Sequence, residues 1–169
     1  IYGYARICCI SFEMGTCSVK LLFENWRKYL SEGMSQEEVQ SIVDRIFDQI
    51  VNDRGPARQG KPKVELHADI YARHSGIAGM KGEVSKEAKA EFVDAENAIY
   101  VYYPNMTNEE DVIRSILHEY EHACQDPKKY EEFRELGFDG LDNPYEKAAR
   151  RAEETWEKYS VNWAGEPPE

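Results

Sequence analysis

Apolar residues recur at helical spacing in two stretches near the start of the chain. Those of the first stretch are Val19, Leu22, Phe23, Trp26, Tyr29 and Leu30. Gly33 follows as a C-terminal stop, and Ser35 with Glu38 forms a capping box that opens a second helix. The apolar face of that helix consists of Val39, Ile42, Val43, Ile46, Phe47 and Ile50. Residues 1–55 are therefore predicted to form an N-terminal arm and helices. These helices either belong to the core or cover a cleft as a pro-segment, and the core is favoured because Ile42, Ile46 and Ile50 need apolar partners.

Alternating apolar and polar residues predict a small sheet within residues 63–103. In its first strand the apolar side chains are Val64, Leu66, Ala68 and Ile70. Two more strands are predicted at 90–94 and 99–103, joined by a turn near 95–97. Between the first strand and the second, residues 76–82 contain three glycines and are expected to form a loop.

Helical patterns return in the last third of the chain. Thr107 and Glu110 match a capping box that begins a helix predicted over 107–125, and Asp126-Pro127 ends it. A short helix closing at Gly137 follows. Asn143 before Pro144 is typical of an N-cap followed by proline at the first helical position, which predicts a last helix over 143–159.

These elements indicate an α+β fold. With 169 residues the chain is long enough for one domain with a real core, so residues 1–169 are expected to form a single domain. It should be mostly helical, with a short, mainly antiparallel sheet of about three strands packed on the helix over 107–125.

The net charge of the chain disfavours some classes of binding partner. The net charge is −11, and residues 106–169 carry 17 acidic and 8 basic side chains, a net of −9. This acidity disfavours binding to nucleic acid or to an anionic membrane surface and is compatible with a basic peptide substrate.

Composition also bears on the compartment. No apolar run approaches the roughly 20 residues of a membrane span, and no signal peptide is recognisable, so we expect a cytoplasmic protein. The four cysteines, Cys8, Cys9, Cys17 and Cys124, form no C-x-x-C pair, which favours a reducing compartment.

The strongest chemical signal is the sequence His118-Glu119-Tyr120-Glu121-His122, an H-E-x-x-H motif. Residues four apart lie one above the other on a helix, so His118 and His122 can bind the same ion. Glu119 lies beside them and can reach a water on that ion. Zinc suits this arrangement because it accepts nitrogen and oxygen ligands and leaves a position open for water. The alternative is an exposed polar helix face with two histidines.

A catalytic zinc usually has three protein ligands, and no histidine follows His122. The third ligand is therefore expected to be a downstream carboxylate. The candidates are Asp126, Glu131, Glu132, Glu135, Asp139, Asp142, Glu146 and Glu153. Glu146 is favoured because it lies in the first turn of a new helix. The alternatives for Glu146 are a capping box with Asn143 or an ion pair with Arg150.

The H-E-x-x-H helix, its break, and the later Asn143-Pro144-Tyr145-Glu146 resemble the gluzincin branch of the zincin metallopeptidases. The likeness is greatest to small single-domain members of phage or plasmid type, including the ImmA/IrrE type. It covers about residues 98–155.

The resemblance implies a Zn²⁺ cofactor, with His118, His122 and Glu146 as metal ligands and Glu119 as general base. It also implies a zincin-like fold with an edge strand beside the cleft, for which residues 99–103 are the candidate. Some gluzincins carry an aspartate one turn after the ligand glutamate, where this chain has Arg150. Glu153 or a backbone carbonyl is then expected to orient a zinc histidine.

The predicted function is zinc-dependent hydrolysis of peptide bonds in a peptide or protein substrate. Zinc and Glu119 would activate the attacking water, and the substrate chain could add as a strand to the sheet edge. Possible donors to the developing oxyanion are Tyr145, Tyr120, His67 and His74. The alternative is a non-catalytic binding or regulatory protein on the same scaffold, which would have no need of a carboxylate beside the first ligand.

Overall fold

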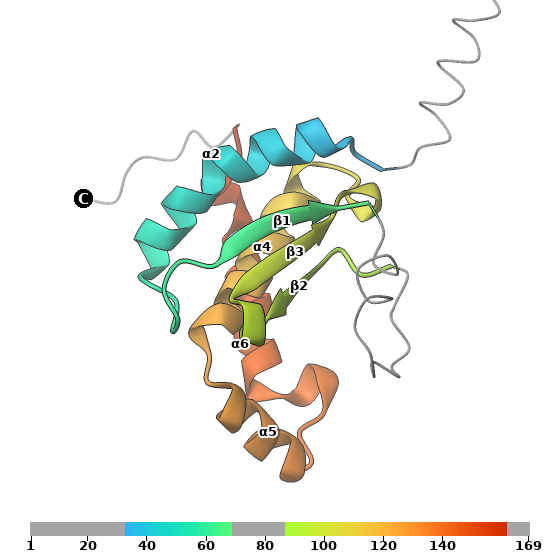
Figure 1. The fold of residues 1–169 in the computed structure, drawn as a ribbon. Helices are drawn as coiled ribbons and strands as arrows, with labels where there is room; N and C mark the ends of the chain where they lie inside the picture. Colours follow the sequence, from blue (N-terminus) through green and yellow to red (C-terminus); the bar gives the residue numbers. More distant parts are fainter. Residues whose placement is uncertain (1–32, 69–86, 162–169) are drawn as a thin grey trace, which may run out of the picture. The chain divides into compact units, whose positions relative to one another are not determined.

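The computed structural model describes residues 33–68 and 87–161 (Figure 1). The predicted helix that ends before Gly33, the loop over 76–82 and His74 lie outside the described residues. The element order is α2, β1, β2, β3, α4, α5 and α6, with short 3₁₀ turns between some of them. The predicted α+β class is confirmed, and so is a sheet of three strands.

Helix α2 spans Gln36–Arg54 and begins at the predicted capping box. The Glu38 N–H donates to Ser35 Oγ at 3.2 Å, and the Ser35 N–H donates to Glu38 Oε2 at 2.9 Å. Most of the predicted apolar face is buried, namely Val39, Val43, Ile46, Phe47 and Ile50. These side chains pack against the helix that carries the H-E-x-x-H motif, so α2 belongs to the core as predicted.

The sheet has the order β1-β3-β2 (Figure 1). Its strands are β1 (Lys63–His67), β2 (Ala90–Val93) and β3 (Ala98–Tyr102). β1 pairs with β3 in parallel and β2 pairs with β3 antiparallel. The sheet is therefore mixed rather than mainly antiparallel. A 3₁₀ turn over Asp94–Glu96 and the left-handed Asn97 connect β2 to β3 near the predicted position.

The prediction that residues 99–103 form the edge strand is wrong. Residues 99–102 lie in β3, the central strand, and every residue of β3 is buried, while Tyr103 begins a 3₁₀ turn. A run of consecutive apolar residues is typical of a strand buried on both faces, and Ala98-Ile99-Tyr100-Val101-Tyr102 has that character. The strand at the edge next to the motif helix is β2.

Helix α4 spans Glu109–Cys124 and packs on the face of the sheet that carries Ile99 and Val101. Its N-cap is Asn108 rather than the predicted Thr107. Asn108 Oδ1 accepts the Asp111 N–H at 2.9 Å, while Asp111 Oδ2 accepts the Thr107 N–H at 3.0 Å. The capping pattern is thus shifted by one residue because Asp111, not Glu110, bonds back to the chain before the helix.

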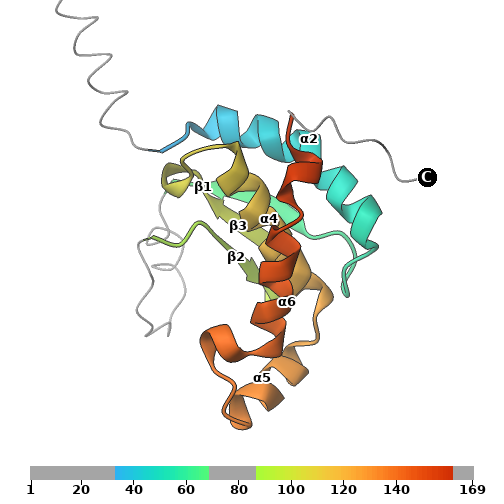
Figure 2. The same ribbon diagram turned by 180° about the vertical axis from the view of Figure 1, so that it is seen from behind.

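Two helices follow α4. Helix α5 spans Pro127–Glu135, and helix α6 spans Pro144–Glu153 with Asn143 as its N-cap, as predicted. The helix predicted over 143–159 ends its α-helical part at Glu153, and a 3₁₀ turn covers Trp156–Tyr159. Two other 3₁₀ turns lie at Tyr103–Asn105 and Gly140–Asp142. Seen from behind, α6 runs along α4, and α5 lies at the end of the structure opposite α2 (Figure 2).

Within the described ranges, no helix has the length and apolar character that crossing a membrane would need.

Replacing Ile113 by alanine should destabilise the protein strongly. Ile113 is fully buried on the face of α4 that packs into the core. Loss of its side chain leaves a cavity, and we expect the free energy of unfolding to fall by about 2–5 kcal/mol in urea denaturation. Leu136→Ala is the control, because Leu136 is 72% exposed and its loss should change stability by about 0.5 kcal/mol or less. Equal effects of the two variants would contradict the packing described above.

Candidate metal centre

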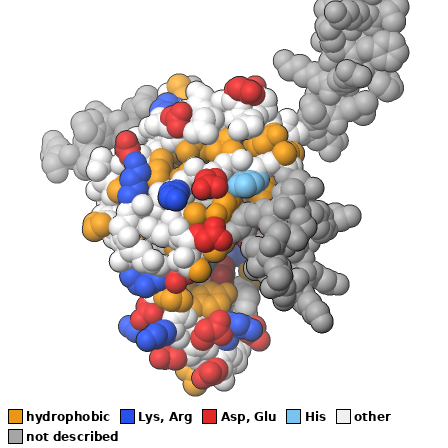
Figure 3. Space-filling model, viewed as in Figure 1, with side chains coloured by type: hydrophobic (Ala, Val, Ile, Leu, Met, Phe, Trp, Pro, Cys, Tyr) orange, Lys and Arg blue, Asp and Glu red, His pale blue; other side chains and the backbone are white. Residues whose placement is uncertain are grey.

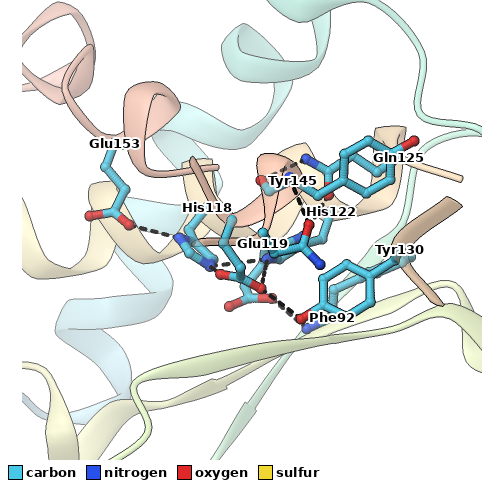
Figure 4. A network of polar contacts seen from close by, with 10 residues as sticks. Phe92, His118, Glu119, His122, Gln125, Tyr130, Tyr145 and Glu153 are labelled. Carbon is cyan, nitrogen blue, oxygen red and sulfur yellow. Dashed lines mark hydrogen bonds and ion pairs between the residues drawn. The ribbon is translucent and has the colours of Figure 1, made fainter. Parts of the chain in front are cut away.

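His118 and His122 lie one turn apart on the same side of α4, as the motif predicts (Figure 4). Ile116, Leu117 and Tyr120 on the other side of the helix are fully buried. The side chains of His118 and His122 are 21% and 18% exposed, respectively, so they lie at the boundary of the core. Their Nε2 atoms are 3.0 Å apart and face one another across a common space.

Glu146 reaches the two histidines from α6. Its Oε2 lies 3.6 Å from His118 Nε2 and its Oε1 lies 3.6 Å from His122 Nε2. In the described part of the chain, His118, His122 and Glu146 form the group of potential ligand atoms that lie within 4.8 Å of one another. The structure thus brings together the three residues predicted as ligands.

The alternative capping role of Glu146 has no support in the hydrogen bonds at the start of α6. The cap is made by Asn143, whose Oδ1 accepts the Tyr145 N–H at 2.9 Å. The Glu146 carboxylate instead accepts a hydrogen bond from the Tyr130 hydroxyl at 3.1 Å and faces the histidines. Helix α6 therefore directs this carboxylate toward α4.

The outer nitrogen of each imidazole has its own oxygen partner. His118 Nδ1 lies 2.7 Å from Glu153 Oε1, and His122 Nδ1 lies 2.8 Å from Gln125 Oε1 (Figure 4). Gln125 is itself held, because its Nε2 donates to the Tyr145 carbonyl at 3.1 Å. An oxygen acceptor at Nδ1 favours the tautomer that leaves Nε2 free to bind a metal. Glu153 was one of two partners expected to orient a histidine, whereas Gln125 was not predicted.

The donor set and its spacing fit a tetrahedral metal such as zinc. Zinc bonds to nitrogen and oxygen are about 2.0–2.1 Å long, which places tetrahedral ligand atoms about 3.3 Å apart. The separations of 3.0, 3.6 and 3.6 Å lie on either side of that value. Two imidazoles and one carboxylate also leave a fourth position for water or substrate, as in catalytic zinc sites.

Glu119 lies between the histidines and strand β2. Its Oε2 accepts the backbone N–H of Phe92 at 2.7 Å, so the edge strand fixes one oxygen of the carboxylate (Figure 4). The surrounding protein removes water from this side chain, and this burial raises the pKa of the Glu119 carboxyl above its ordinary value. The charges of His118 and His122 oppose the shift without cancelling it.

The four residues named from the sequence as possible oxyanion donors, each more often structural than catalytic, differ in where they lie. Tyr120 is buried and donates to the Gly55 carbonyl at 2.6 Å, which makes it a structural residue. His67 contacts Tyr100, a residue on the sheet face opposite α4, and therefore does not reach the site. His74 lies outside the described residues. Tyr145 lines a cavity together with His122 and Glu146.

Tyr130 is a site residue that the sequence pattern does not single out. It contributes its hydroxyl to Glu146 from α5, and its ring meets that of His122 edge-on at 6.5 Å between centroids. Burial, together with the Glu146 carboxylate, raises the pKa of Tyr130. The tyrosine therefore stays protonated and able to donate. In the sequence, Tyr130 belongs only to the pattern of the short helix that closes at Gly137.

No family model, curated protein or solved structure matches this chain.

Glu153→Ala is expected to weaken metal binding at the three-ligand group. Partners that orient metal-binding histidines typically contribute about 10- to 100-fold in affinity, and Glu153 holds the Nδ1 of His118. Affinity for Zn²⁺ can be measured by competition with a chelator of known strength. Glu154→Ala removes a neighbouring exposed carboxylate and serves as the matched control. Equal affinities of the two variants would mean that Glu153 does not orient the histidine.

Proposed function

We propose that this protein is a zinc-dependent peptidase of the zincin type, with His118, His122 and Glu146 as metal ligands. The observation that carries the proposal is the convergence of two Nε2 atoms and a carboxylate at 3.0 and 3.6 Å, with each Nδ1 held by its own oxygen partner. The H-E-x-x-H sequence and the resemblance to gluzincins agree with this geometry.

When bound, zinc would supply a Lewis acid that polarises the substrate carbonyl and makes an attached water more acidic. Glu119 is the general base. Because its Oε2 accepts the Phe92 N–H, its Oε1 is the atom that takes the proton of the attacking water and passes it to the leaving amine.

The surroundings of Glu119 provide for substrate binding as well. β2 is an edge strand beside the site, and an extended substrate segment would pair with it. Tyr130 directs its hydroxyl toward the metal ligands from α5. This hydroxyl donates to Glu146 in the structure and would turn from Glu146 to donate to a developing oxyanion. Tyr130 thus replaces Tyr120 and His67 in this role.

The competing function is a binding or regulatory protein on the same scaffold. Such a protein would not need a base next to its first metal ligand. The position of Glu119, against both the histidine pair and the edge strand, favours catalysis.

Purified protein should contain close to one zinc ion per chain, measured by atomic spectroscopy at known protein concentration. His118→Ala should abolish this content, and Glu146→Ala should weaken zinc affinity strongly, because each removes one of three ligands. His67→Ala is the matched control, since it removes an imidazole on the sheet face opposite α4. Failure of the folded wild-type chain to take up zinc on titration would refute the metal centre.

Glu119→Gln should lose peptide hydrolysis while keeping zinc. Loss of a general base typically lowers the rate by about 10²- to 10⁴-fold, and the amide cannot accept the water's proton. Glu121→Gln, an equal change in the same motif but at the Arg54 ion pair, should stay active. Cleavage of a peptide library can be followed by mass spectrometry. A fully active Glu119→Gln variant would rule out the mechanism.

A further inference from the structure

A cavity of about 260 Å³ adjoins the metal centre on the His122 side. It is lined by residues from β2, the end of α4, α5 and the start of α6. Pockets for drug-sized ligands measure about 300–1,000 Å³, so this one has the size for a single long side chain. It shares His122 and Glu146 with the metal centre, and its other lining residues do not belong to the three-ligand group.

The walls of this cavity are aromatic. Phe92, Tyr130 and Tyr145 line it, and the rings of Tyr130 and Tyr145 lie 6.5 Å apart. The Tyr145 ring also contacts the Phe133 ring edge-on, with 5.4 Å between the ring centroids. Aromatic faces pack against aliphatic chains. They also attract cationic groups, because the π-system is negative above the ring. On the outside, hydrophobic side chains reach the surface between the sheet and α5, with charged side chains around them (Figure 3).

The charged groups of the cavity have one sign. Asp94, Asp126 and Glu131 line it together with Glu146, and its described lining contains no lysine or arginine. The first three of these carboxylates each have a partner. Asp94 forms an ion pair with Arg58, and Glu131 lies 3.1 Å from Arg134. The Asp126 carboxylate accepts a hydrogen bond from the Lys128 N–H. A carboxylate has about four acceptor sites, so these groups keep capacity for a further donor.

The opposite side of the metal centre differs. A second cavity of about 330 Å³ lies beside His118 and Glu119. Its lining contains Lys89 and Arg114 as well as acidic residues, and Lys89 forms an ion pair with Asp111 at 2.5 Å. The lining of the second cavity contains two cationic side chains, whereas the described lining of the aromatic cavity contains none. Arg58 and Arg134 approach the aromatic cavity only as ion-pair partners of its carboxylates.

We propose that the aromatic cavity is a specificity pocket for a lysine or arginine side chain of the substrate, next to the bond that is cleaved. The aliphatic stem would lie against Tyr130 and Tyr145, and the cationic end would face the carboxylates at the rim. This inference rests on the proposed peptidase function and adds a substrate class to it: basic peptides, with the basic residue on the His122 side of the site.

Cleavage and binding test this proposal separately. In the first measurement, the zinc-loaded full chain is incubated with short peptides randomised at every position, and the cleavage sites are read by mass spectrometry. Lysine and arginine should be enriched at one position next to the cleaved bond. Glu119-dependent cleavage without that enrichment would overturn the pocket assignment and leave the peptidase function intact.

The second measurement needs no catalysis. The same peptides are equilibrated with the zinc-loaded Glu119→Gln protein, and the bound fraction is sequenced. Lysine and arginine should be enriched, and adding Glu131→Lys should reduce the enrichment about five-fold, because the new charge lies at the cavity rim. Adding Glu135→Lys instead makes the same charge change on α5 outside the cavity lining and should preserve the enrichment.

The outcomes separate the two proposals. If the wild-type chain cleaves nothing, the peptidase function fails, and enrichment of basic peptides in the bound fraction would still support the pocket. Binding without any preference for lysine or arginine, or equal effects of Glu131→Lys and Glu135→Lys, would overturn the pocket.

Discussion

Close packing of α6 on α4 is the constraint on which the candidate site depends. Two ligand atoms come from α4 and the third from α6, so a small displacement of either helix would separate them. The buried residues of α6 are Ala149 and Ala152, three positions apart on one face. Their small side chains let the two backbones approach closely. Glu146 is one turn before Ala149 on the same side, and the packing that buries the alanines therefore also directs its carboxylate to the histidines.

Arg54 connects this helix pair to the rest of the core. It lies in the last turn of α2, and its guanidinium donates to Glu121 of α4 at 3.2 Å, to the Ala152 carbonyl of α6 at 3.4 Å and to Thr155 at 3.0 Å. A planar group with five donors can bridge several acceptors at fixed angles. Tyr120 makes a second link, through its hydroxyl to Gly55 just after α2. The early part of the chain thus supports the back of the motif helix.

The electrostatics of the candidate site would favour a bound cation. Glu119, Glu146 and Glu153 surround two imidazoles within a partly buried space. Burial disfavours the ionised form of a carboxylate that has no positive partner. The raised pKa of Glu119 is a consequence of this burial. A divalent ion at the Nε2 atoms would compensate the negative charge. The same excess of acidic groups continues into the aromatic cavity, where a basic side chain would have the corresponding effect.

The sequence by itself determined the local features of this protein. The capping box at Ser35, the proline after Asn143 and the four-residue spacing of His118 and His122 depend on neighbours within one or two turns, and they specify α2, the start of α6 and the shared face of the histidines. Among the several carboxylates that follow the motif, the sequence favoured Glu146 as the third ligand because it lies in the first turn of a new helix. Tertiary structure decided that Glu146 faces the histidines while Glu153 and Gln125 hold their outer nitrogens. It also placed β3 in the centre and β2 at the edge, and brought Tyr130 to Glu146. These relations join residues that are far apart along the chain or on different elements, and their geometry follows from how helices and strands pack, which no local pattern encodes.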